Sequence, residues 1–124
     1  MIITRTPFRV SFAGGGSDLP SFYQRHEGCV LSMTINKYMY VSIHPTFNRD
    51  ETVVKYSQTE IVRDVRAVQH PIARQLLLDY GIDGVEIVST ADVPAGTGLS
   101  TSSAYTVGLI HALSVDYNLV CYYN

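Results

Sequence analysis

Alternating and helically spaced apolar positions divide the chain into short elements. Residues 2–13 are rich in β-branched and aromatic side chains, are interrupted by Pro7 and end in three glycines. We therefore expect two short strands that feed a loop. Arg9 and Ser11 fall on the polar face of the second of these strands.

A short helical turn is expected after the three glycines. Ser17 and Asp18 are residue types that favour the N-cap. Pro20 suits an early helical position, because the N–H that proline lacks is not needed there.

Residues 28–43 show a clear alternation on both sides of the Asn36–Lys37 junction. The apolar positions that share a face are Leu31, Met33 and Ile35 before the junction and Met39, Val41 and Ile43 after it. This pattern predicts two antiparallel strands that turn at the junction.

The second half of the chain predicts strands and helices in mixed order. Residues 52–56 and 85–88 have the composition of short strands, whereas the stretch between residue 57 and Arg66 shows no clear pattern. Residues 71–80 have helical spacing, and Gly81 is a natural C-cap. The predicted fold class is therefore α+β, a mixed or antiparallel sheet packed with helices.

A second helix is expected over residues 102–113, and it is apolar nearly all round. This pattern is typical of a buried central helix that needs cover on several sides. The remaining segment, SVDYNLVCYYN, offers little cover. We therefore expect the sequence to be incomplete, as after a frameshift or a premature stop.

The composition and net charge of the chain exclude several classes of function. The 124 residues suit one domain, and 46% hydrophobic with 16% charged residues is an ordinary globular balance. A formal net charge of -2 without a basic cluster excludes an electrostatic footprint for nucleic acid or anionic lipid. No apolar run approaches the length of a membrane span. We expect a soluble, cytoplasmic protein that binds neither nucleic acid nor membrane.

The metal-binding residue types are scattered. Cys29 and Cys121 stand far apart, with no CxxC motif and no pairing with histidine, so neither a zinc site nor a disulfide framework is expected. The four histidines, none at ligand spacing, are His26, His44, His70 and His111. We interpret them as structural, and the tyrosines as residues of the sheet.

The strongest chemical signal is DVPAGTGLSTSSA, residues 92–104, between a predicted strand and a predicted helix. Gly96 and Gly98 allow positive φ and let backbone N–H groups approach an anion closely. The following helix adds the partial positive charge of its N-terminus, which suits a polyphosphate. The segment has neither the GxxxxGK[ST] spacing nor GxGxxG.

Four hydroxyl side chains follow the two glycines. They are Ser100, Thr101, Ser102 and Ser103. They can cap the helix, donate to phosphate and supply one ligand to Mg²⁺. The alternative is a tight strand-to-helix turn capped by serine, but such a cap does not require four hydroxyls. The pattern therefore favours phosphate binding.

Two segments resemble the GHMP kinases, the group of galactokinase, homoserine kinase, mevalonate kinase and phosphomevalonate kinase. PAGTGLSTSSA resembles their ATP-phosphate loop: Pro, three residues, Gly-Leu, a small residue and a Ser/Thr run with Ala. Ser100 departs from it, since glycine is more usual there. TPFRVSFAGGGSD resembles their first motif. Together with INKYMYVSI and STADVPAGTGLS, it is most similar to the heptose 7-phosphate kinase branch, from about Thr6 to Leu113.

The resemblance implies a fold and a set of site residues. The fold is the GHMP kinase N-terminal domain, of the ribosomal protein S5 domain 2-like type. Residues 1–124 would form this ATP-binding domain incompletely, without the C-terminal domain. ATP would contact Pro94, Gly96, Thr97, Gly98, Leu99, Ser100, Thr101, Ser102 and Ser103. Ser102 takes the position of the Mg²⁺-ligating serine. Arg9 would act at the transferred group, and the sugar would lie at Gly15, Gly16, Ser17 and Asp18.

The implied reaction is phosphorylation of D-glycero-D-manno-heptose 7-phosphate at its anomeric hydroxyl by ATP and Mg²⁺. Three alternatives stay open: another GHMP sugar kinase, similar to galactokinase or fucokinase; a nucleotide- or sugar-binding fragment without turnover; and a remnant that folds poorly. The family's acidic Mg²⁺ ligand and catalytic aspartate lie downstream of the loop. Asp116 is the one carboxylate after Ser103. We therefore expect no turnover by the 124-residue chain alone.

Overall fold

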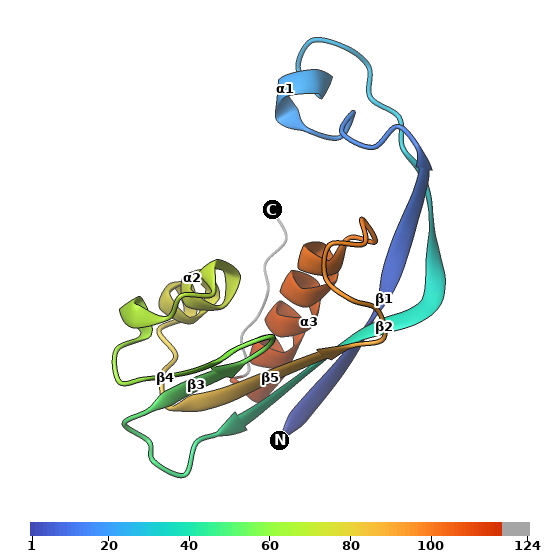
Figure 1. Cartoon of the computed structure of the whole chain (residues 1–124). Coiled ribbons are helices and arrows are strands. Elements are labelled where there is room, and N and C mark those ends of the chain that lie inside the picture. The colour runs from blue at the N-terminus through green and yellow to red at the C-terminus, as the bar shows by residue number, and fades with distance from the viewer. Residues whose placement is uncertain (118–124) are drawn as a thin grey trace.

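The computed structural model describes residues 1–117, in which five strands form one sheet. Figure 1 shows this sheet with its helices. The elements, in chain order, are β1 (Ile2–Ala13), α1 (Pro20–Tyr23), β2 (Leu31–Pro45), β3 (Thr52–Lys55), β4 (Thr59–Val62), the 3₁₀ turn η1 (Val65–Ala67), α2 (Pro71–Tyr80), β5 (Val85–Ala91) and α3 (Thr101–Asp116). The strand order is β1-β2-β5-β3-β4. The β3–β5 pair is parallel and the other pairs are antiparallel. The predicted α+β class with a mixed sheet is confirmed.

The core lies between the sheet and the two long helices, which cover the same face of the sheet (Figure 1). The largest fully buried side chains are Phe8, Val41, Ile43, Val54, Val68, Leu77, Val85, Ile87, Leu109 and Leu113. They come from the strands and from both helices, so one hydrophobic core holds the site's supporting elements together.

The strands β1 and β2 form a long hairpin whose far end projects from the core and carries α1 (Figure 1). In this arm the apolar side chains of Phe12, Leu31 and Met33 are exposed. The predicted interruption of the first strand was wrong: β1 runs through Pro7 with only a register shift between Pro7 and Arg9. A proline is tolerated here because β1 is an edge strand, where a missing N–H breaks no ladder on the open side.

The turn predicted at Asn36–Lys37 was also wrong, since β2 is one strand of 15 residues. Leu31 and Ile43 differ by an even number of positions, so the alternation continues in phase through the junction. What changes along β2 is burial: Met33 is exposed on the arm, whereas Ile43 is fully buried in the core.

The helices lie where the sequence predicts them, but their caps and burial differ in part from the predictions. Helix α2 has the predicted bounds, with Gly81 as its C-cap at φ 64°. Helix α1 begins at Pro20 as expected, but its N-cap is Leu19 and no side chain caps it. Helix α3 is not buried all round: it packs one side on β1 and β2, and Val107 stays 57% exposed.

Two further expectations concern what the chain lacks. Within residues 1–117 no helix is long and apolar enough to cross a membrane, and no group of three metal-ligating side chains converges. Cys29 is a free, exposed thiol, while Cys121 lies outside the described residues.

Candidate nucleotide site

The glycine- and serine-rich loop connects β5 to α3 and is anchored where it leaves the sheet. The carboxylate of Asp92 accepts a hydrogen bond from the Tyr38 N–H at 2.8 Å. The Asp92 N–H in turn donates to the Tyr38 carbonyl at 3.0 Å. Asp92 thus fixes the start of the loop to β2, a role that the sequence did not reveal.

The middle of the loop is held open by its glycines. Gly96 has φ 81° and Gly98 has φ 72°, the left-handed region that side chains disfavour. A Cβ atom added at either position would meet no other atom within 4 Å. The space beside both glycines is therefore open, so an anion could approach the backbone of the loop closely.

Ser100 closes the loop in a strained conformation. At φ 60° it is the one non-glycine residue with positive φ in the described chain. This conformation costs a serine about 1 kcal/mol. Ser100 is the N-cap residue of α3, but its hydroxyl makes no capping hydrogen bond, so the predicted capping by this side chain was wrong.

The first turn of α3 therefore keeps N–H groups that no side chain caps. No acidic residue lies in this turn, so nothing offsets the positive end of the dipole of a 16-residue helix. Ser102 and Ser103 expose their side chains here, and Thr101 is half-buried. This end of α3 can bind a negatively charged group.

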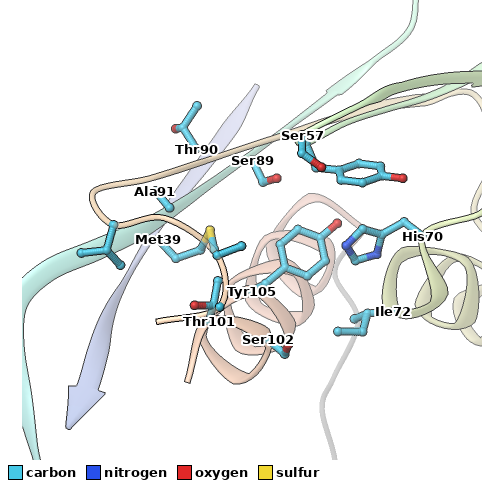
Figure 2. A pocket seen from close by; sticks show the side chains of 14 residues that line it. Met39, Ser57, His70, Ile72, Ser89, Thr90, Ala91, Thr101, Ser102 and Tyr105 are labelled. Atoms are coloured by element: carbon cyan, nitrogen blue, oxygen red, sulfur yellow. The ribbon is translucent and has the colours of Figure 1, made fainter. Parts of the chain in front are cut away.

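A pocket of about 410 Å³ opens beside the loop (Figure 2). Its walls come from β2, the β3–β4 turn, α2, β5, the loop and α3. The lining residues are Met39, Tyr56, Ser57, His70, Ile72, Ser89, Thr90, Ala91, Val93, Ala95, Gly96, Thr101, Ser102 and Tyr105. Since Gly96 and Ser102 line it, the pocket is continuous with the glycine loop and with the N-terminus of α3.

Three aromatic rings form one wall of this pocket. The ring of His70 lies between those of Tyr56 and Tyr105, with centroids 4.8 and 4.7 Å away. The N–H of Ala73 donates to Nδ1 of His70 at 3.3 Å, so the neutral ring carries its proton on Nε2. Burial lowers the pKa of His70, which keeps the ring neutral.

A carboxylate behind the wall holds it in place. Glu60 accepts hydrogen bonds from the Tyr56 hydroxyl at 2.9 Å and from the His70 N–H at 3.1 Å, and also from the Gln69 N–H. Burial opposes the charged carboxylate, but these hydrogen bonds lower the pKa of Glu60 overall. The bond to Glu60 raises the pKa of Tyr56.

The sequence did not identify this wall. The sequence predicts a structural role for His70 and a place in the sheet for the tyrosines. The structure shows that His70 does cap α2, and that it also lines the pocket. Tyr56, His70 and Tyr105 are far apart in sequence and share no motif, so only the fold brings them together.

The first motif runs from the core, where Phe8 is buried, out to the arm, where its glycines, Ser17 and Asp18 lie. Arg9 is exposed on β1. The side chain of Asp18 accepts a hydrogen bond from the Gly16 N–H at 3.2 Å, and the Ser17 hydroxyl donates to the Gly14 carbonyl at 2.7 Å. No hydrogen bond or ion pair within residues 1–117 joins Arg9 or Asp18 to the loop of residues 92–100. These residues therefore stay predictions for the sugar side.

Comparisons with known proteins agree with this geometry. Residues 65–120 match the family model described as GHMP kinases N terminal domain. The chain is 28% identical to the D-glycero-alpha-D-manno-heptose 7-phosphate kinase of Campylobacter jejuni, over 95% of this chain and 38% of that protein. It is also 28% identical to the galactokinase of Chloroflexus aurantiacus, over 94% of this chain and 32% of that protein.

Solved structures share the fold. A D-glycero-D-manno-heptose 1-phosphate kinase from Bacteroides thetaiotaomicron superposes with a TM-score of 0.80 at 25% identity, over 96% of this chain and 43% of that one. The mevalonate kinase of Methanococcus jannaschii superposes at 0.73 with 20% identity, over 98% and 42%. The chain thus spans less than half the length of these relatives. The chain thus has the fold of the GHMP kinase N-terminal domain, and residues 65–120 match the family model itself.

Proposed function

We propose that residues 1–124 form the nucleotide-binding domain of an ATP-dependent sugar-phosphate kinase. The observation that carries this proposal is the open glycine loop at the uncapped N-terminus of α3, continuous with a pocket that can hold a flat ring. Phosphoryl transfer depends mainly on positioning and on neutralising phosphate charge, and this end of the domain supplies both.

ATP fits this site in one orientation. Its phosphates bind the N–H groups of residues 96–103 and the hydroxyls of the first turn of α3. Its base lies in the pocket, between the apolar side chains of Met39 and Ile72 and the aromatic wall. Pro94 and Leu99 shape the two ends of the loop, and the Thr97 hydroxyl donates to the Pro94 carbonyl at 3.2 Å.

Mg²⁺ is the metal that such a reaction uses, and one oxygen donor at this site fits it. Ser102 exposes a hydroxyl at the rim of the pocket, which suits a hard cation that prefers oxygen ligands. Mg²⁺ usually takes its other ligands from phosphate and water. Ser102 would therefore hold the ion beside the phosphates, where it neutralises their charge.

The acceptor is proposed to be D-glycero-D-manno-heptose 7-phosphate, phosphorylated at its anomeric hydroxyl. The support is the similarity of the first motif to that branch and the 28% identity to a heptose 7-phosphate kinase. Galactose is the second candidate, because galactokinases match at the same identity. In either case Arg9 would stabilise charge on the transferred group, and Gly15, Gly16, Ser17 and Asp18 would hold the sugar.

Calorimetric titration tests the proposal. ATP with Mg²⁺ is titrated into the purified chain, and heptose 7-phosphate or galactose is then titrated into the chain loaded with a non-hydrolysable ATP analogue. We expect binding of ATP and preference for the heptose. Absence of ATP binding by the folded chain would refute the nucleotide domain, and preference for galactose would favour the second candidate. A transfer assay with both sugars shows whether a binding fragment without turnover describes the chain better.

Replacing Asp18 with Asn tests the sugar side. Asparagine keeps a carbonyl oxygen for the Gly16 N–H and removes only the charge, so the loop should persist. We expect affinity for the sugar phosphate to fall about tenfold, since a charged acceptor for hydroxyls is lost, with ATP affinity unchanged. Asp18→Ala is the control that also breaks the loop bond. Equal losses of sugar and ATP affinity in Asp18→Asn would indicate a loop-folding role instead.

A further inference from the structure

One buried hydroxyl in the pocket has no partner. Tyr105 is 4% exposed, and among the residues that the structure describes its hydroxyl oxygen is the buried side-chain polar atom without a hydrogen bond. Leaving such a group unpaired is a net cost to folding, so an unpaired hydroxyl in a native core indicates a partner that residues 1–117 do not supply, such as a ligand.

The position of Tyr105 indicates that the missing partner binds at the candidate nucleotide site. It lies four residues after the start of α3 at Thr101, so it stands about one helical turn behind the phosphate-binding end. Both residues line the same pocket. In Figure 2 the hydroxyl of Tyr105 points to the side of the pocket where Ser57 and His70 lie.

Three polar groups near Tyr105 already have partners. The Tyr56 hydroxyl donates to Glu60, Nδ1 of His70 accepts from the Ala73 N–H, and the Ser89 hydroxyl donates to the Lys55 carbonyl. Of the two tyrosine hydroxyls in the wall, the one of Tyr56 is thus bonded and the one of Tyr105 is free.

We infer that Tyr105 is a specificity-determining residue for the nucleotide, and that its hydroxyl forms a hydrogen bond with the polar edge of the base held in this pocket. The inference rests on the proposed nucleotide-binding function. An apolar pocket accepts the faces of any flat ring, so discrimination between rings needs a polar group at the edge. Burial raises the pKa of Tyr105, so the hydroxyl keeps its proton and can donate as well as accept.

This role gives Tyr105 opposite effects in the free and bound protein. Without nucleotide the unpaired hydroxyl costs stability, and with nucleotide it contributes affinity. A purely structural tyrosine would not show this reversal. Tyr105→Phe removes the hydroxyl and keeps the ring that packs on His70 at 4.7 Å.

The test compares three ligand conditions in wild type and Tyr105→Phe. Without ligand the variant should melt at the same temperature as wild type or higher. Its affinity for ATP should fall about fivefold to tenfold, the effect of one hydrogen bond. Its affinity for inorganic tripolyphosphate should not change, because that ligand reaches only the loop. Tyr56→Phe is the matched control: its hydroxyl is bonded to Glu60, so this variant should melt lower.

Several results would overturn the inference. They are unchanged ATP affinity in Tyr105→Phe, an equal loss of ATP and tripolyphosphate affinity, and a lower melting temperature than wild type, which would reveal a structural partner for the hydroxyl. If the wild-type chain binds neither ATP nor tripolyphosphate, the proposed function itself fails and the inference fails with it. The two failures are thus distinguishable: wild type that binds ATP, with unchanged ATP affinity in Tyr105→Phe, refutes the inference alone, whereas wild type that binds neither ligand refutes the proposed function.

Discussion

Replacing Gly98 with Val is expected to abolish ATP binding in a protein that remains folded. Gly98 has φ 72°, where a β-branched residue is disfavoured by about 1–2 kcal/mol. Valine would escape this strain by moving to negative φ, which turns the loop N–H groups away from the phosphates. The fold survives because a Cβ at this position meets no atom within 4 Å. Calorimetric titration with ATP measures the effect, and a melting curve verifies folding.

Gly81→Val provides a matched control for this experiment. Gly81 has φ 64° and equally open surroundings, but it ends α2 instead of shaping the loop. The two variants should lose similar stability, because they carry the same backbone strain. Only Gly98→Val should lose ATP. Wild-type ATP affinity in folded Gly98→Val would show that the loop does not bind the phosphates.

The fold class was predictable from the sequence because periodic apolar spacing survives in the long strands and in α2, and α3 is a continuous apolar run. The errors arose where a local signal competed with that spacing. Pro7 favours a strand break by its residue type, but β1 lies at the edge of the sheet, where the N–H that proline lacks would have no partner strand on the open side. The Asn36–Lys37 pair was read as a turn, although Ile35 and Met39 keep the same phase across it.

Of the candidate site, only the conformation of the glycine loop could be predicted from the sequence. Gly96 and Gly98 indicate positive φ directly, because glycine favours that conformation. The residue type of Ser100 does not indicate positive φ, since serine rarely adopts that conformation. The one indication was that the similar GHMP kinase pattern usually has glycine at this position. Its left-handed backbone is the result of the loop geometry that surrounds it.

The pocket could not be predicted from the sequence. Its aromatic wall joins the β3–β4 turn, the N-cap of α2 and the second turn of α3, and sequence spacing gives no measure of distances between elements. The unpaired hydroxyl of Tyr105 could not be predicted either, because the absence of a hydrogen bond depends on every residue that packs around it in the fold.

Replacing Gly108 with Leu is expected to destabilise the domain more than any loop substitution. Gly108 lets α3 approach the sheet: a Cβ there would lie 3.0 Å from the Thr6 hydroxyl and 3.3 Å from Cγ2 of Val41. The Thr4 hydroxyl also donates to the Gly108 carbonyl at 2.9 Å. Because these neighbours are strand residues in the packed interior, a leucine must push the helix away and break that bond. Overpacking and the lost bond together should cost about 2–4 kcal/mol.

The substitution should also weaken ATP binding, although no ligand touches Gly108. The residue lies seven positions after Thr101, about 10 Å along the helix, so a helix displaced at Gly108 carries its N-terminus and the loop with it. Val107→Leu is the matched control, since it adds bulk at a neighbouring position that is 57% exposed. Urea unfolding measures the free energy of each variant, and ATP titration measures the site. A Gly108→Leu protein with wild-type unfolding free energy would mean that α3 is not seated on the sheet as closely as the Thr4 bond indicates.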